Sequence, residues 1–206
     1  FNSLFLASVQ TVIVVTVSSF AGYYLSRFAF TGRSLFLQSL LVLQAFPAIT
    51  LVIPIFLIVY WVGLINTIYA PILVITALEL PFFIFIMKGF FDAVPWDIEM
   101  SAMTDGASRR QAFRMVILPQ VRVGLIAVGV FAFIKGWEEY VFVTGLTTGQ
   151  SYTVMSTYLY YVSEDVMGVD YGIVAAVAVI YLLPALLLYL ACQKYLTQMT
   201  LGGVKG

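Results

Sequence analysis

The segment 97–120, "DIEMSAMTDGASRRQAFRMVILPQ", is a polar stretch that stands between two long apolar blocks. It contains three acidic residues and three arginines, in a chain of 206 residues that is 62% hydrophobic and only 10% charged. Soluble domains average roughly 45–50% apolar and about 25% charged residues. The composition therefore predicts an integral membrane protein, and the polar segment predicts a water-exposed connection between membrane spans.

The apolar blocks on both sides of this segment have the length of membrane helices, because about 20 residues are needed to cross the hydrocarbon core. Several of them carry prolines, which predict kinks where neighbouring helices can cover the freed carbonyl groups. We expect an all-α, polytopic helix bundle in which residues 1–206 form a single transmembrane domain. The five expected spans are Leu4 to Leu25, Leu35 to Val62, Ile68 to Phe90, Val121 to Thr144 and Tyr171 to Gln193, and the prolines are Pro47, Pro54, Pro81 and Pro184.

Basic residues indicate the orientation of these spans, since loops rich in lysine and arginine stay on the cytoplasmic side. Two connections, residues 63–67 and 145–170, contain no basic residue. Apart from Lys135, which lies within a span, the other nine basic residues fall in the other loops, at the adjoining span ends or in the tail. We expect segment 97–120 and the C-terminus to be cytoplasmic. The N-terminus then points outward without a charged leader, so we expect a further upstream helix.

The polar segment itself predicts two short helices. Pro95 suits the first turn of a helix, Asp97 and Glu99 place negative charge at its N-terminal end, and Gly106 can close it in the left-handed conformation. The stretch that follows has apolar and basic residues on opposite faces and is expected to stop at Pro119. The apolar face comprises Ala112, Phe113, Val116 and Ile117, and the basic face comprises Arg109, Arg110 and Arg114.

Two interpretations of this segment remain open on physical grounds. It can be an interfacial anchor, with basic side chains at lipid headgroups and apolar ones in the acyl boundary. It can also be a docking element for a cytoplasmic partner, because acids, a glycine and small residues make a poor lipid anchor. The residues alone do not decide between them.

The segment resembles the EAA loop of binding-protein-dependent ABC importer permeases, whose pattern runs Glu-Ala-Ala, three residues, Gly, nine residues, Ile, any residue, Leu-Pro. Gly106 fits, Val116 stands for the isoleucine, and Leu118 and Pro119 complete the spacing. At the front, Met100 replaces the glutamate and Ser101 the first alanine. The sugar-import branch, of the maltose-permease G-subunit type, is also similar at "NSLFLASVQT" (2–11), "FTGR" (30–33), "MKGFFDAVP" (87–95), "QAFRMVILP" (111–119), "FIKGWEEYVF" (133–142) and "LTQMTLGGVKG" (196–206).

This resemblance implies a permease in the inner membrane of a prokaryote, which moves a sugar or sugar-like solute delivered by an extracytoplasmic binding protein. It implies a second homologous permease subunit and two cytoplasmic ATPase subunits, which bind ATP and Mg²⁺. The loop at about 92–119 would be the coupling helix that sits in a cleft of an ATPase. The residues implied as ATPase contacts are Glu99, Met100, Ser101, Ala102, Met103, Asp105, Gly106 and Ala107.

Charged residues within the expected spans are the other candidate functional groups. Lys135, Glu138 and Glu139 lie on one side of a helix, and Lys135 is about 21 Å beyond Val121 at 1.5 Å per residue. Charges at this depth are costly and should face a bundle interior or a water-filled path. We expect Lys135 to pair locally with Glu138 or Glu139.

That pair can be structural, or the same helix face can border the sugar pathway together with Trp137 and Tyr140. Glu79 can pair with Lys135 across helices or contribute to the path. Gln44 can line the path, although a lone amide in a span more often joins two helices.

Other function classes are less compatible with the sequence. The chain has no histidine and no Gly-x-x-x-x-Gly-Lys phosphate loop, so we expect no catalytic site, no metal site and no ATP site of its own. The net charge of zero gives no basis for nucleic-acid binding. A proton-coupled secondary transporter that uses the intramembrane charges is the alternative, and a scaffold subunit is a third possibility. The spacing of the EAA-like loop favours the importer.

Overall fold

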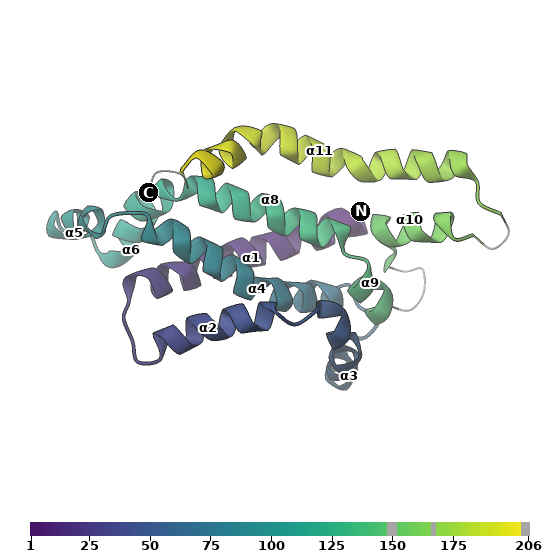
Figure 1. Ribbon diagram of the computed structural model, residues 1–206, viewed down its shortest axis with the longest axis horizontal. Helices are drawn as coiled ribbons and strands as arrows, with labels where there is room; N and C mark the ends of the chain where they lie inside the picture. The colour runs from purple at the N-terminus through teal and green to yellow at the C-terminus, as the bar shows by residue number, and fades with distance from the viewer. Residues whose placement is uncertain (148–151, 166–167, 203–206) are drawn as a thin grey trace.

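The computed structural model describes residues 1–147, 152–165 and 168–202, and in these ranges it contains helices and connecting turns but no strand. The expected all-α bundle is confirmed. Figure 1 shows the helices as an elongated bundle with α11 along one side. The elements are α1 (Asn2–Arg27), α2 (Arg33–Gln44), η1 (Ala48–Leu51), α3 (Val52–Val62), α4 (Tyr69–Asp92), α5 (Trp96–Thr104), α6 (Arg109–Gln111), η2 (Ala112–Ile117), α7 (Leu118–Gln120), α8 (Arg122–Glu138), α9 (Val141–Leu146), α10 (Met155–Ser163) and α11 (Tyr171–Gly202).

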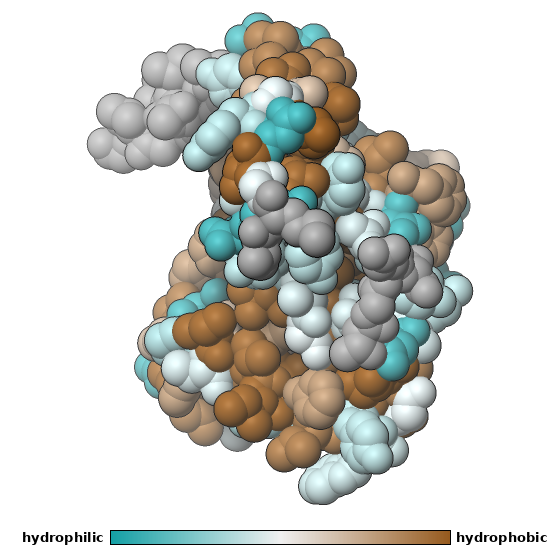
Figure 2. Space-filling model, turned by 90° about the vertical axis from the view of Figure 1, so that its right-hand side faces the viewer, coloured by the Kyte–Doolittle hydropathy of each residue, from teal (hydrophilic) through white to brown (hydrophobic). Residues whose placement is uncertain are grey.

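Three described helices are long and apolar enough to cross a membrane alone: α1, α4 and the Tyr171–Lys194 part of α11. Two bent pairs qualify only when each is taken as one span, namely Arg33–Gln44 with Ala48–Val62 and Arg109–Gln120 with Arg122–Glu138. Figure 2 looks along the bundle from the α10 end and shows apolar side chains spread over its outer surface. Large apolar surfaces of this kind suit contact with lipid or with other membrane helices.

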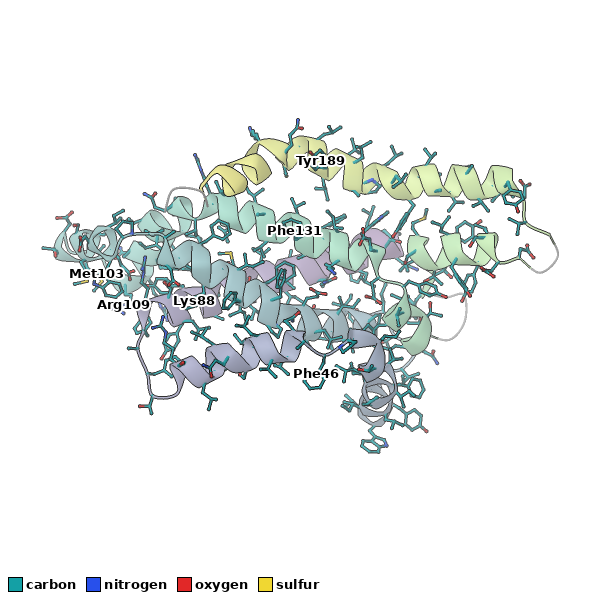
Figure 3. The ribbon with its side chains drawn as sticks, viewed as in Figure 1. Phe46, Lys88, Met103, Arg109, Phe131 and Tyr189 are labelled. Atoms are coloured by element: carbon teal, nitrogen blue, oxygen red, sulfur yellow. The ribbon has the colours of Figure 1, made fainter. Side chains whose placement is uncertain are left out.

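The expected span Leu35 to Val62 is not one kinked helix. It breaks between α2 and η1, and the two halves meet at 90°. Pro47 has no N–H to continue the helix and disfavours helical backbone at Phe46, which explains the break. Pro54 lies in the first turn of α3, where a proline is tolerated. Figure 3 shows Phe46 at this bend.

The expected span Val121 to Thr144 is also wrong as a continuous helix. Helix α8 ends at Glu138, and Glu139 is extended with ψ 122° before α9 begins. The amphipathic stretch does not stop at Pro119 as expected, because α7 runs on to Gln120. The preceding η2 is a π-helical turn, whose wider backbone can accommodate a proline that lacks a donor.

The core forms around α1, which packs mainly against α4 and α8. Close approach to α4 depends on Gly22, because a Cβ there would lie 2.8 Å from the backbone nitrogen of Lys88 and 2.9 Å from the Cβ of Met87. The buried side chains around this crossing include Val14, Tyr23 and Met87. Helix α11 is different, since only 6% of its most apolar window is buried.

We predict that Gly22→Ala destabilises the protein by about 1–3 kcal/mol, because the new methyl group forces α1 and α4 apart. Gly89→Ala is the matched control, since Gly89 is also helical, lies on α4 and has open space around its Cβ position. Alanine there should be neutral or stabilising by up to about 1 kcal/mol. Thermal unfolding of the detergent-solubilised protein measures both changes. Equal unfolding temperatures for the two variants would contradict the close packing.

Candidate functional site

The polar segment forms a compact projection at one end of the bundle (Figure 1). Helix α5 begins after Pro95, with Asp97 and Glu99 in its first turn, as the sequence predicts. At its other end, Gly106 has φ 94°. The N–H of Gly106 donates to the carbonyl of Met103, and the N–H of Ala107 donates to the carbonyl of Ala102. This pair of bonds is a Schellman closure, so the predicted end of the helix is confirmed.

The next helix starts immediately after this closure. The Ser108 hydroxyl accepts from the N–H of Gln111, and the Gln111 side chain accepts from the N–H of Ser108 at 2.8 Å. Such a capping box satisfies donors that the first turn of a helix leaves free. The connection between α5 and α6 is short, and hydrogen bonds fix both of its ends.

Glu99 anchors α5 to α1. Its side chain is completely buried, the Tyr23 hydroxyl donates to its Oε1 at 2.5 Å, and Arg27 Nε lies 2.9 Å from its Oε2. The contact between Arg27 and Glu99 is an ion pair whose geometry is not that of a hydrogen bond. Another nitrogen of the Arg27 guanidinium donates to the Val94 carbonyl at 2.9 Å. The guanidinium also lies over the Trp96 ring, 5.5 Å from its centroid. A buried carboxylate needs such partners, so the helix is held firmly.

An aromatic layer lies under this anchor. The Tyr23 ring packs against Phe113 of η2 with centroids 4.6 Å apart, and against Phe91 of α4 at 5.7 Å. Phe91 and Phe113 are themselves buried. The segment from α5 to α7, which we call the coupling segment after the role that the EAA resemblance implies, thus shares one core with α1 and α4.

The opposite face of α5 is open. A shallow depression of about 320 Å³ is lined by Asp97, Met100, Ser101, Thr104 and Asp105. Of the other predicted contact residues, Gly106 is exposed, and Ala102, Met103 and Ala107 are half-buried. Figure 3 shows Met103 at the tip of the molecule, with Arg109 and Lys88 at the same end. Glu99 does not belong to this face, because the helix turn directs its carboxylate inward to Arg27.

The intramembrane charges are arranged differently from the prediction. Among the described residues, Lys135 forms no ion pair within 4 Å, so a direct pair with Glu138 or Glu139 is not formed. The helix ends before Glu139, and this removes the spacing of four that the pairing needs. The Glu139 carboxylate instead accepts from the N–H of Phe142 at 2.8 Å and caps α9. Lys135 and Glu138 are exposed, and Glu79 is half-buried.

Three other predicted pathway residues make contacts within the chain. Trp137 is buried and donates from Nε1 to the Tyr181 carbonyl at 3.0 Å, which joins α8 to α11. Gln44 donates to the Leu78 carbonyl at 2.9 Å, in the turn of α4 that precedes its proline. Tyr140 is half-buried, with its ring centroid 4.9 Å from that of Tyr160. The side chains of Trp137 and Gln44 therefore each join two helices, which gives both a structural role.

Sequence reasoning missed the two partners of Glu99. In the sequence, Arg27 is one of the basic residues that indicate orientation, and no motif includes Tyr23. Their spacing of four places both side chains on one face of α1, a pattern that is visible in the sequence. Nothing in the sequence shows that this face meets Glu99, because the contact spans 76 residues.

The described residues thus form a helical bundle with membrane-length apolar helices and short helices fixed at one end. Residues 14–199 match the family described as binding-protein-dependent transport system inner membrane component. The chain belongs to this family. The match supports an ABC importer over a proton-coupled secondary transporter.

Curated relatives with similar sequences are named as permease proteins. The diacetylchitobiose uptake system permease protein NgcG of Streptomyces coelicolor is 33% identical over 194 residues, which cover 94% of this chain and 64% of that protein. The trehalose transport system permease protein SugB of Mycobacterium tuberculosis is 32% identical, covering all of this chain and 76% of that protein. The trehalose/maltose transport system permease protein MalG of Thermococcus litoralis is 33% identical, with coverages of 100% and 74%.

Solved structures support the fold. A bacterial ABC transporter involved in the import of the acidic polysaccharide alginate superimposes with a TM-score of 0.71 at 21% identity, covering 95% of this chain and 76% of that chain. The MetNI methionine ABC transporter superimposes with a TM-score of 0.60 at 18% identity, covering 93% of each chain.

We predict that Glu99→Gln weakens the attachment of α5 by about 3–5 kcal/mol, because the buried Arg27 guanidinium loses its counter-charge. The double variant Arg27→Gln, Glu99→Gln should recover part of this loss. Trypsin cleavage after the exposed Arg109 and Arg110, together with thermal unfolding, reports the attachment.

Asp97→Asn is the matched control, because Asp97 lies in the same helical turn but is exposed. It should change stability by about 1 kcal/mol or less, as expected for a surface charge near a helix end. If Glu99→Gln and Asp97→Asn are cleaved at the same rate, Glu99 is not an anchor.

Proposed function

We propose that the chain is the membrane-spanning permease subunit of an ABC importer that moves a sugar or sugar-like solute into the cytoplasm. The observation that carries this proposal is the projecting α5, which has an open outer face and a buried anchor to α1. The named substrates of the relatives NgcG, SugB and MalG are all saccharides, which supports the substrate class. No ATP site is needed in this chain, because the ATPase partners would bind ATP and Mg²⁺.

The proposed complex contains this chain, a second homologous permease subunit, two cytoplasmic ATPase subunits and an extracytoplasmic binding protein. The orientation places α5 and the C-terminus in the cytoplasm. Its support is the position of Lys88 and Arg109 at the α5 end, where the C-terminal end of α11 also lies (Figures 1 and 3). Basic residues favour the cytoplasmic side of a membrane.

Coupling would begin at the outer face of α5. Its depression presents the carboxylates of Asp97 and Asp105 beside the Met100 side chain, so a partner surface with basic and apolar groups would complement it. Because Met100 replaces the usual glutamate of the EAA pattern, apolar contact would contribute at that position. Movement of the ATPase would pull α5, and the Glu99 contacts would transmit that movement to α1.

The translocation path would follow the exposed polar face of α8. Lys135 and Glu138 are exposed within this chain, and Glu79 of α4 lies near enough to Lys135 to interact with it electrostatically. Exposed charges in a membrane helix require a polar neighbour or water. We therefore keep Glu79, Lys135 and Glu138 as pathway residues.

We predict that Gly106→Val leaves the complex assembled but abolishes substrate-stimulated ATP hydrolysis. A Cβ at Gly106 would meet no atom within 4 Å, so we attribute the effect to the left-handed backbone, at a cost of about 1–2 kcal/mol. The measurement is the ATPase rate of the reconstituted complex with and without binding protein and substrate.

Gly32→Val is the matched control. Gly32 also has a positive φ, 89°, and open space around it, but it lies in the loop between α1 and α2. It carries the same backbone cost away from α5, so stimulation should persist. Normal stimulation in an assembled Gly106→Val complex would contradict the coupling role.

A further inference from the structure

A second depression lies between α1 and the coupling segment. It has a volume of about 370 Å³ and is lined by Phe20, Arg110, Phe113 and Arg114. These residues belong to α1, α6 and η2, so the depression spans the junction between a membrane helix and the polar segment. It is separate from the acidic depression on the outer face of α5.

The aromatic side chains form its apolar part. Phe20 is 56% exposed on α1, and its ring centroid lies 5.5 Å from that of the nearly buried Phe113. The Phe113 ring also packs against the Tyr23 ring. Phe20 lies seven residues before Arg27, or about 10 Å along α1. The apolar part of the depression therefore lies on this span, about 10 Å from its end.

The two arginines form the polar part of the depression. They are exposed and four residues apart, and among the described residues neither forms an ion pair within 4 Å. Four other basic groups near this end have partners. Those contacts are Arg27 with Glu99, Lys88 with Asp92, Arg33 with the Leu25 carbonyl and Arg109 with the Phe28 ring.

We propose that this depression binds an anionic phospholipid, with its phosphate between Arg110 and Arg114 and an acyl chain along Phe20. Guanidinium groups match phosphate oxygens in geometry and charge, and two together favour an anionic headgroup. The apolar wall on a membrane helix accounts for the chain of a lipid, which a free phosphate lacks. A bound lipid would contact α1 and the coupling segment together and hold them against each other.

The test uses the full chain purified with the subunits that accompany it. Native mass spectrometry counts retained lipid after exposure to phosphatidylglycerol or phosphatidylcholine at equal concentration. The wild type should retain phosphatidylglycerol in preference. The variant Arg110→Gln, Arg114→Gln should retain roughly tenfold less, because two charge-assisted contacts are lost. Arg109→Gln is the control, since Arg109 has a similar exposure but does not line the depression.

Competition with glycerol 3-phosphate separates a lipid site from a phosphate site. This soluble headgroup should not displace phosphatidylglycerol, and displacement would overturn the proposal. Equal phosphatidylglycerol retention in the glutamine pair and in Arg109→Gln would also overturn it. The proposal would also be overturned if the Arg110→Gln, Arg114→Gln variant lost a partner subunit while its lipid retention stayed unchanged. If the double variant does not assemble, Arg114→Gln alone should retain several-fold less phosphatidylglycerol than the wild type. Retention equal to that of the wild type would overturn the proposal.

Discussion

The buried carboxylate of Glu99 is the constraint on which the arrangement of the α5 end depends. A charge removed from water is stable only with compensating partners, and both side-chain partners here, Tyr23 and Arg27, come from α1. The position of α5 is therefore set by α1. The position of α1 is in turn set by its packing against α4, because the absence of a side chain at Gly22 lets the two backbones approach. A force on α5 has a continuous packed route into the membrane bundle.

Other parts of the chain are held less tightly. Helix α11 is almost unburied over its apolar window, and Trp137 of α8 hydrogen-bonds to and stacks on its Tyr181. The α2 to α3 bend is apolar and exposed, with α2 joined to α4 by the Gln44 amide. These surfaces are where lipid and the proposed second permease subunit would bury apolar area. A tightly packed centre with exposed apolar outer helices suits a subunit that works inside a larger complex.

Much of this fold follows from the sequence, because apolar length predicts helices and glycine and proline chemistry predicts their ends. The start of α5 after Pro95 and its closure at Gly106 are confirmed. A kink at Pro47 is predicted, but its 90° angle and the end of α8 before Glu139 are not, since hydropathy does not register a break inside an apolar run. The role of Glu99 was also not predictable. Its negative charge suggests a contact with a partner, whereas only the tertiary fold brings Arg27 and Tyr23 to it.

The central claim is that α5 and α1 move together when the proposed ATPase partners close. Pulsed electron spin resonance can test this with spin labels at Ser101 on the exposed face of α5 and at Val17 on the exposed face of α1, after Cys192, the single native cysteine, is replaced by serine. The measurement compares the assembled complex without nucleotide and trapped with ATP and vanadate. The account predicts that the distance between these labels stays constant, while the distance from Ser101 to a label on the second permease subunit changes. A change between Ser101 and Val17 as large as that second change would show that α5 moves independently of α1, and would contradict the account.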